Sequence, residues 1–394
     1  MGERAPVADW ASDFDHLDPA WAEDPFPIWK ELRQTCPVAH TDRFSGVYFP
    51  LRYEDIRAVA YDTDHFSSRR NTIREGNPEI PPNPPFSSDP PAHRDQRKLL
   101  LPLFTPAAIQ ELEPRARAIC RETLEGLSGR TEFDAAVDYA QNIPTRVITH
   151  MLRLPEHEGE RFRGWLRKLY VGFREPAIAR AAYAEMNAFM SDHVAECRKT
   201  HGEDLIGYLF EAELNGQPLS DEYIVGTVRL LLLAGIDTTW SMVGTCLWHL
   251  ATHADDRRRL VTEPHLIPTA IEEFLRAYAP ALLGRVIIKD TVLGGCPLKT
   301  GEMVMLSYGA ANRDPALFSE PDEIIIDRTE NPHVTFGLGI HRCIGAHLAR
   351  MELRVGIQEW LLKFPEFELK QGAVVEWTSG LVRGPRRIPI TILH

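Results

Sequence analysis

A ten-residue stretch near the end of the chain, FGLGIHRCIG at positions 336–345, combines residue types that can do chemistry. Its three glycines let the backbone turn tightly and approach a large flat partner. Its one thiol, Cys343, lies just before a helical run that extends to Arg354. A helix N-terminus and loop amide donors both favour a thiolate over a thiol. Cys343 is therefore a candidate metal ligand or nucleophile.

The residues alone leave other interpretations of this thiol open. A lone cysteine beside a glycine turn is most often a buried free thiol. His341 lies two residues from Cys343 and could act as a base for a nucleophile, but an extended loop does not by itself place that imidazole on the sulfur. Zinc is disfavoured because no second cysteine lies nearby.

An aspartate and a threonine interrupt the most apolar helical pattern of the chain. The pattern runs from Asp221 to His253, with Ser220 as its N-cap. It would span on the order of 50 Å at ~1.5 Å per residue, and its middle is apolar nearly all round, which predicts a buried central helix. Asp237 in such a helix is costly unless it is used or is paired with a distant cation.

Two further pairs of polar residues occur at helical spacing. Glu273 and Arg276 are three residues apart, and His93 and Arg97 are four apart, so each pair shares one face of a helix. On their own such pairs are usually solvated and carry little information.

Together, and in this order along the chain, these stretches resemble the cytochrome P450 superfamily from about Asp89 to the end. The stretch 336–345 matches the haem-ligand signature of that family at every characteristic position. Residues 234–239, AGIDTT, resemble its oxygen-activation motif. Glu273 and Arg276 resemble its ExxR pair, which joins a second arginine, here Arg328, to brace the loop that holds the cysteine.

The resemblance implies the following cofactor-binding residues: His93, Arg97, Ala234, Arg285, Phe336, Gly337, His341, Cys343 and Gly345. Cys343 would be the only metal ligand, bound to the iron of haem b. His93, Arg97, Arg285 and His341 would meet the haem propionates, because carboxylates need cations or strong donors.

The implied function is a haem-thiolate monooxygenase. It would insert one oxygen atom from O₂ into a small to medium hydrophobic organic substrate, by hydroxylation or O-dealkylation. Electrons would come from NAD(P)H through a separate ferredoxin reductase and ferredoxin. Asp237 would relay protons and Thr238 would hold a water at the oxygen, as the two catalytic residues. The rival functions are a peroxide-driven peroxygenase and a non-catalytic haem-binding sensor.

Helix geometry refines this site. Asp237 and Thr238 are about 100° apart, so they cannot both face the haem. Thr238 shares a stripe with Leu231, Ala234, Gly235 and Met242, which we assign to the substrate pocket. Thr238 could instead simply bond back to the carbonyl of Ala234. Residues 281–283 are expected over the haem, and residues 70–90 and 173–179 are expected to form the lid.

Charge and composition exclude some partners. The chain has 394 residues and a formal net charge of −12, which argues against nucleic-acid binding and against adsorption to an anionic membrane. The longest apolar run of its strongest helix, 230–236, is too short for a membrane span. Its six cysteines are scattered without a CxxC pair, which favours a reduced cytoplasmic protein, and we expect a monomer. Arg94, Lys98, Arg342 and Arg350 could form a basic face for an acidic ferredoxin, or could be scattered solvated charges.

The elements that position these residues are mainly helical. Apolar periodicity predicts helices at 111–127, 156–173, 179–198 and 221–253. Short strands are expected at 285–288 and 302–306, with a Gly294–Gly295 turn between them, and again between 364 and 394. The proline-rich stretch 77–91 must be a loop. The expected fold is mainly α with a small β region, the cytochrome P450 fold with a long central helix over the haem, in one domain of residues 1–394.

Overall fold

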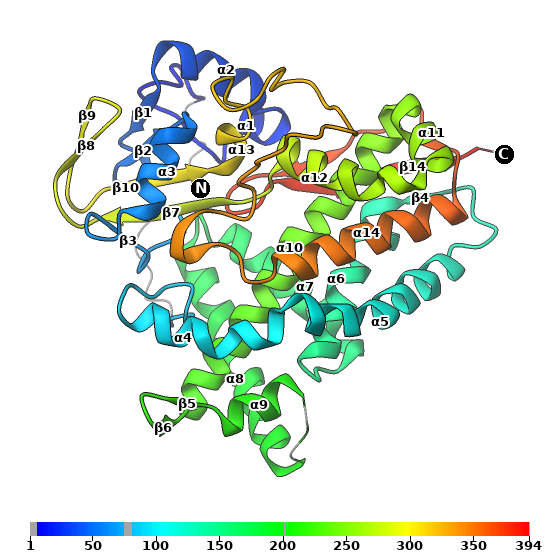
Figure 1. Ribbon diagram of the computed structural model, residues 1–394, viewed down its shortest axis with the longest axis horizontal. Helices are drawn as coiled ribbons and strands as arrows, with labels where there is room; N and C mark the ends of the chain where they lie inside the picture. The colour runs from blue at the N-terminus through cyan, green and yellow to red at the C-terminus, as the bar shows by residue number, and fades with distance from the viewer. Residues whose placement is uncertain (1–5, 75–80, 201, 203, 394) are drawn as a thin grey trace.

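The computed structural model describes residues 6–74, 81–200, 202 and 204–393. Helices fill most of the molecule, and the largest sheet lies at one edge, beside the N-terminal helices (Figure 1). The helices are α1 Pro19–Glu23, α2 Phe26–Thr35, α3 Tyr53–Tyr61, α4 Ala92–Leu100, α5 Pro106–Glu125, α6 Asn142–Met151, α7 Gly159–Val171, α8 Pro176–Thr200, α9 Leu205–Glu211, α10 Asp221–Thr252, α11 Ala254–Thr262, α12 Ile267–Tyr278, α13 Tyr308–Ala311 and α14 Ala346–Lys363.

The strands form one larger sheet and several small ones. They are β1 Val38–Thr41, β2 Val47–Pro50, β3 Phe66–Ser67, β4 Glu132–Asp134, β5 Glu213–Leu214, β6 Gln217–Pro218, β7 Leu282–Ile287, β8 Thr291–Leu293, β9 Cys296–Leu298, β10 Met303–Ser307, β11 Phe367–Leu369, β12 Glu376–Thr378, β13 Gly384–Arg387 and β14 Pro389–Ile392. The five-stranded sheet has the order β1-β2-β10-β7-β3, and a three-stranded sheet has the order β11-β14-β4. In the larger sheet β10 is parallel to β2 and antiparallel to β7, with Val304 opposite Arg285.

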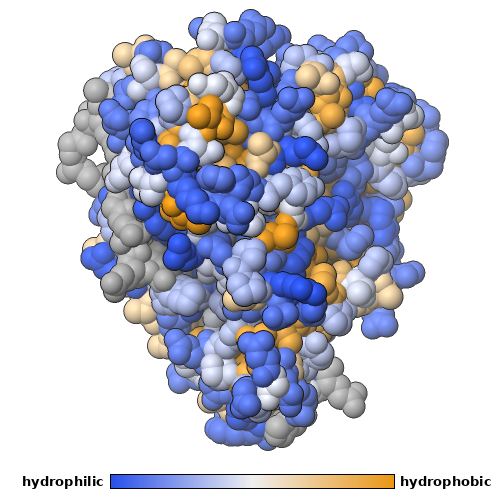
Figure 2. All heavy atoms as spheres, turned by 60° about the vertical axis from the view of Figure 1, so that its left-hand side comes forward, coloured by the Kyte–Doolittle hydropathy of each residue, from blue (hydrophilic) through white to orange (hydrophobic). Residues whose placement is uncertain are grey.

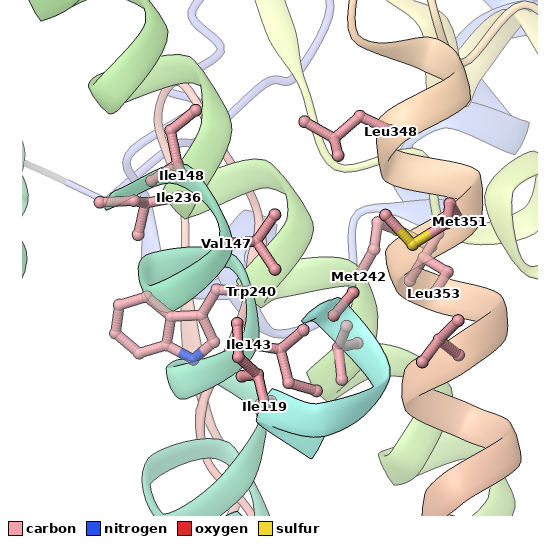
Figure 3. Close-up of a cluster of buried hydrophobic side chains, with 14 of the residues drawn as sticks. Ile119, Ile143, Val147, Ile148, Ile236, Trp240, Met242, Leu348, Met351 and Leu353 are labelled. Carbon is pink, nitrogen blue, oxygen red and sulfur yellow. The ribbon is translucent and has the colours of Figure 1, made fainter. Parts of the chain in front are cut away.

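Helix α10 is the central element of the helical region. It spans 32 residues, and the Ser220 hydroxyl accepts a hydrogen bond from the Tyr223 N–H at 3.2 Å, as expected for an N-cap. Its Ile236, Trp240 and Met242 pack against apolar side chains of α5, α6 and α14 (Figure 3). Among the described residues it is long and apolar enough to cross a membrane, but 72% of the relevant stretch is buried inside the protein. It is therefore the core helix.

The expected mainly α fold with a small β region is confirmed. Most predicted boundaries agree within three residues, but α5 begins five residues before its predicted start and α14 extends beyond Arg354 to Lys363. The Gly294–Gly295 turn belongs to a separate hairpin of β8 and β9, rather than directly joining the two longer strands. The described part of the proline-rich loop, 81–91, contains neither helix nor strand, and residues 77–80 lie outside the described residues. The six-residue π-helix Ala135–Ala140 was not expected, because its i→i+5 bonds have no sequence signature.

The visible surface of the protein is largely polar, in contrast to its apolar interior (Figure 2). The face in Figure 2 is largely hydrophilic, with apolar side chains in small separate groups. The apolar residues of α10 accordingly lie inside the molecule, and 22 residues of this helix are buried.

Candidate functional site

A deep cavity of about 820 Å³ lies between α10 and the loop that contains Cys343. Its walls come from α4, α7, α8, α10 and α14, from β7, and from the described parts of the segment 69–87. Ala281 and Leu283 line it as expected, whereas Leu282 points into a different core cluster, because side chains alternate along a strand. Phe173 also lines the cavity, so one end of the second predicted lid reaches it.

The loop 336–345 is held open around the thiol by its own backbone. The Cys343 N–H donates to the Phe336 carbonyl at 2.7 Å, which closes the loop. Gly337 and Gly339 have φ values of +77° and +66°, and a Cβ at Gly339 would lie 2.5 Å from the Ala60 carbonyl oxygen. Position 339 therefore requires glycine because the loop passes close to the backbone of Ala60, and not because a cofactor approaches it. Gly345 differs from the expectation, since its φ is −82° and it serves as the N-cap of α14.

Cys343 presents its thiol to the cavity. All six cysteines lie in the described residues, and Cys343 is the most exposed of them, but its exposed surface faces this interior space. Burial raises the pKa of the Cys343 thiol, while the Gly345 N–H and the charges of Arg97, Arg342 and Arg350 act in the opposite direction. The amide donors and cations that would stabilise a metal-bound thiolate are therefore in place.

A buried ionic network supports the chain just before this loop. Glu273 and Arg276 are both 0% exposed and form a two-pronged ion pair with N–O distances of 2.7 Å. Arg328 donates to the same Glu273 carboxylate at 3.0 Å. Arg276 also donates to three backbone carbonyls, those of Asn312, Pro321 and Glu323. The expected meeting of these three charged residues is present.

A second network ties this support to the thiol loop itself. The Asn312 amide donates to the Thr335 hydroxyl at 2.8 Å and accepts from the Val334 N–H at 2.8 Å. Arg350 donates to Glu272 at 2.7 and 2.8 Å and lies 4.4 Å above the Phe336 ring. Arg350 is therefore engaged inside the structure, and it is not a free member of the predicted basic face.

His93, Arg97 and His341 line one edge of the cavity, and Arg285 lies close behind them without lining it. Helix α4 places His93 and Arg97 on one face, and His341 lies against His93 with ring centroids 4.2 Å apart. Arg285, only 4% exposed, donates to its neighbour's carbonyl, that of Gly284, at 2.7 Å. No carboxylate forms an ion pair with Arg97 or Arg285 among the described residues.

Desolvation at this edge favours neutral imidazoles. Burial lowers the pKa of His93 to about 4, with Arg97 and Arg285 acting in the same direction. Burial likewise lowers the pKa of His341 to about 2, and its Nε2 lies 2.8 Å from the Ser68 hydroxyl. The Nε2 of His93 is buried and has no hydrogen-bond partner among the residues that the structure describes. Cations and an orphaned ring nitrogen at the rim of an apolar cavity fit a large flat group that carries carboxylates, as a haem does.

The Asp237–Thr238 pair lies across the cavity from the thiol loop, on α10. Thr238 is half-buried, faces the cavity, and donates from its hydroxyl to the Ala234 carbonyl at 3.0 Å. Asp237 also borders the cavity, but its carboxylate accepts a hydrogen bond from the Tyr170 hydroxyl and one at 2.5 Å from Arg386. The structure therefore contains both contacts that the sequence left open as alternatives. Thr238 bonds to the Ala234 carbonyl within the helix, and Asp237 pairs with Arg386, a cation that is distant in the sequence.

The predicted stripe of α10 lines the cavity as expected, although its members differ in exposure. All of its members line the cavity, but Leu231 and Met242 are almost fully buried, at 6% and 2% exposure. The less buried side chains on this side of α10 are Leu230, Leu233 and Ala234. Gly235 packs closely on Ile148 of α6, where a Cβ would lie 3.0 Å from the isoleucine, so close helix packing accounts for this glycine.

Tyr170 and Arg386 were not found from the sequence. They come from α7 and β13, 67 and 149 residues away from Asp237, and neither belongs to a recognisable motif. Only an unpaired acid in an apolar helix indicated that some partner had to exist.

Comparison with known proteins identifies the class. Residues 173–391 match the family described as Cytochrome P450. Vitamin D(3) 25-hydroxylase of Pseudonocardia autotrophica is 35% identical over 94% of this chain and 94% of its own length. Mycinamicin IV hydroxylase/epoxidase of Micromonospora griseorubida is 34% identical over 91% of this chain and 94% of its own. The fold and these relatives define a haem-thiolate monooxygenase.

A solved structure agrees with this assignment. The structure of CYP109E1 from Bacillus megaterium in complex with testosterone has a TM-score of 0.86 and 29% sequence identity, and the match covers 95% of this chain and 99% of that one. The chain belongs to the cytochrome P450 family.

Proposed function

We propose that this chain uses haem b to insert one oxygen atom into an apolar substrate of small to medium size, by hydroxylation or O-dealkylation. The observation that carries the proposal is one cavity that Cys343 and the Asp237–Thr238 pair approach from opposite walls. Such a cavity can hold a flat cofactor against the thiol and still leave space for a substrate beside the threonine.

On the thiol side, Cys343 would be the metal ligand, and Phe336, Gly337 and Gly345 would shape the loop around it. The edge formed by His93, Arg97, Arg285 and His341 would bind the two carboxylates of the cofactor. The thiolate-bound haem supplies oxygen activation, and donation from the thiolate favours O–O cleavage, as the general chemistry of this ligand predicts.

On the opposite side, the chain would control water and protons. Ala234 would border the cofactor, and the Thr238 hydroxyl would hold one water by exchanging its bond to the Ala234 carbonyl for a bond into the cavity. The Asp237 carboxylate would deliver protons from the protein exterior when it leaves Arg386.

The apolar walls and the relatives support a hydrophobic substrate. One relative is named as a vitamin D(3) hydroxylase, and one structural neighbour is solved with testosterone. Both molecules are mostly apolar, which suits a lining that includes Leu230, Leu233 and Phe173.

Electron delivery would use a ferredoxin and a ferredoxin reductase. Arg94, Lys98 and Arg342 are exposed near the thiol loop and α4, and Lys98 is only weakly engaged, at 3.7 Å from Asp95. These three residues remain candidates for an acidic partner, without Arg350. We propose a monomeric, cytoplasmic, single-domain protein, and the apolar core cluster that extends from Leu100 to Ile390 supports the single domain.

A carbon monoxide difference spectrum tests the proposal. The reduced protein should show the red-shifted band of a thiolate ligand, Cys343→Ala should lose it, and the matched variant Cys296→Ala should keep it. Product formation should need O₂, NAD(P)H and the two redox proteins. Turnover with hydrogen peroxide alone would favour the peroxygenase, and binding without any turnover would favour the sensor.

A further inference from the structure

Glu272 of α12 joins three elements on the thiol side of the cavity. It accepts two hydrogen bonds from the Arg350 guanidinium of α14, at 2.7 and 2.8 Å. It also lies 2.9 Å from the Nε2 of His333, just before the thiol loop. The Nδ1 of His333 accepts from the Thr335 N–H at 3.3 Å, so Nε2 carries the ring hydrogen and donates it to Glu272. Burial raises the pKa of Glu272, but the bonds from His333 and Arg350 outweigh it and lower the pKa to about 2, so the carboxylate is ionised.

This ion pair presents its positive end to the thiol loop. The Arg350 guanidinium lies 4.4 Å from the centre of the Phe336 ring, and the Phe336 carbonyl accepts from the Cys343 N–H at 2.7 Å. The charge of Arg350 lowers the pKa of the Cys343 thiol, against the larger effect of burial. The Arg350 and Glu272 side chains are 29% and 31% exposed, so water screens their charges only in part.

The other two cations that act on Cys343 are placed differently. Arg97 lies at the edge assigned to the haem carboxylates, which would compensate its charge. Arg342 is exposed, so solvent and salt screen it. Neither forms an ion pair with a carboxylate within the part of the chain that the structure describes. Arg350 is therefore the cation that the chain itself fixes beside the thiol loop.

We infer that Arg350 raises the reduction potential of the thiolate-bound iron, and that Glu272 holds its guanidinium over Phe336 and offsets part of its charge. Both act through the thiol loop, so they are positioning residues. In the reaction concerned, one electron passes from the redox partner to the ferric iron, which becomes ferrous, and no bond at Cys343 is made or broken. A cation near the ligand stabilises the added negative charge. This inference rests on the proposed function and specifies how readily its first electron is accepted.

A purely structural role of the ion pair predicts something else. The pair ties α12 to α14, so breaking it from either side would loosen the same contact. Loosening does not depend on the sign of the charge that is removed. An electrostatic role requires Arg350→Gln and Glu272→Gln to shift the potential in opposite directions.

Redox titration of the haem-loaded variants, followed by haem absorption, tests this sign. A unit charge on the order of 10 Å from a redox centre, in an effective dielectric of ~20, changes a one-electron equilibrium about tenfold. Arg350→Gln should therefore lower the equilibrium constant for reduction about tenfold, equivalent to about 59 mV. Glu272→Gln should raise it about threefold, because the more distant charge is lost and Arg350 is no longer compensated. The double variant should stay within about twofold of the parent.

Two matched variants exclude indirect effects. Arg350→Lys keeps the charge and should restore most of the potential, although the fork is lost. Arg354→Gln removes an arginine of the same helix that is 30% exposed and paired with Glu113, and it should leave the potential unchanged.

The outcomes separate this inference from the proposed function. The reduced carbon monoxide band is recorded for every variant. If the band is present and the two single variants shift the potential in the same direction, or not at all, the electrostatic role is wrong while the monooxygenase stands. If Arg350→Gln does not fold, Glu272→Gln decides, since a raised potential supports the inference and an unchanged or lowered one overturns it. If the parent protein lacks the band, the proposed function itself fails.

Discussion

Replacing Arg386 should reveal what the ion pair with Asp237 does. The two side chains are 17% and 7% exposed, and the N–O distance is 2.5 Å. Arg386→Gln leaves the buried carboxylate with only the Tyr170 hydroxyl, so we expect a loss of about 3–5 kcal/mol in the free energy of unfolding.

The opposite single change should cost less. In Asp237→Asn the Arg386 guanidinium still donates to the Ser241 hydroxyl at 2.8 Å and lies 4.2 Å above the Trp240 ring. The lost charge-assisted hydrogen bond then corresponds to about 1.5–3 kcal/mol. The double variant buries no charge, so its loss should be smaller than the sum of the two single losses by about 1–3 kcal/mol.

Urea unfolding of the four proteins, followed by tryptophan fluorescence, measures this coupling. The exposed pair Asp290 and Lys299 serves as the control cycle and should show no measurable coupling. Additive losses at Asp237 and Arg386, within about 0.5 kcal/mol, would refute the argument that the pair is an energetic unit.

Three further results are expected. Thr238→Ala should keep oxidising NADPH but should form hydrogen peroxide in place of much of the product. Asp237→Asn should instead slow turnover about a hundredfold and show a larger solvent isotope effect. If Thr238→Ala forms as much product per NADPH oxidised as the parent protein, the proton relay is excluded. The Arg354 guanidinium holds the pKa of Glu113 at about 2, below its usual 4.5, so this carboxylate stabilises the fold above pH 4.5 and loses that contribution as the pH falls toward 2. Solvent screening keeps the contribution to about 1 kcal/mol. The difference between Glu113→Gln and the parent in urea unfolding should therefore narrow from pH 7 to pH 3, and parallel curves would contradict this. Arg342→Glu should slow reduction by ferredoxin and weaken its dependence on salt, and an unchanged rate at every ionic strength would remove Arg342 from the docking face.

Local patterns were enough to predict the elements and the thiol side of the site. Helix α10 follows from its apolar periodicity and from Ser220, and the thiol loop follows from glycines at fixed spacing around Cys343. The meeting of Glu273, Arg276 and Arg328 came from family resemblance, because nothing local indicates that a carboxylate will be shared by residues 52 positions apart.

The opposite wall of the cavity could not be predicted in the same way. Arg386 and Tyr170 meet Asp237 only because β13 and α7 both pack beside α10, and tertiary contacts of that kind leave no periodic signal. Arg350 was predicted as part of a basic docking face because it flanks the thiol loop in the sequence. In the structure its guanidinium instead pairs with Glu272 and lies over the Phe336 ring.

The supports of the two cavity walls are separate, and this has an evolutionary consequence. The buried network of Glu273 and Arg276 bonds to backbone between 312 and 325, on the thiol side. The segment 81–83 is instead anchored on the opposite side by Arg229, which donates to the Pro82 carbonyl and to the Asn83 side-chain oxygen. Sequence drift in residues 81–83 can therefore alter which molecules are accepted without disturbing the ligand loop. Descendants of such a chain could acquire new substrates while inheriting the same iron chemistry.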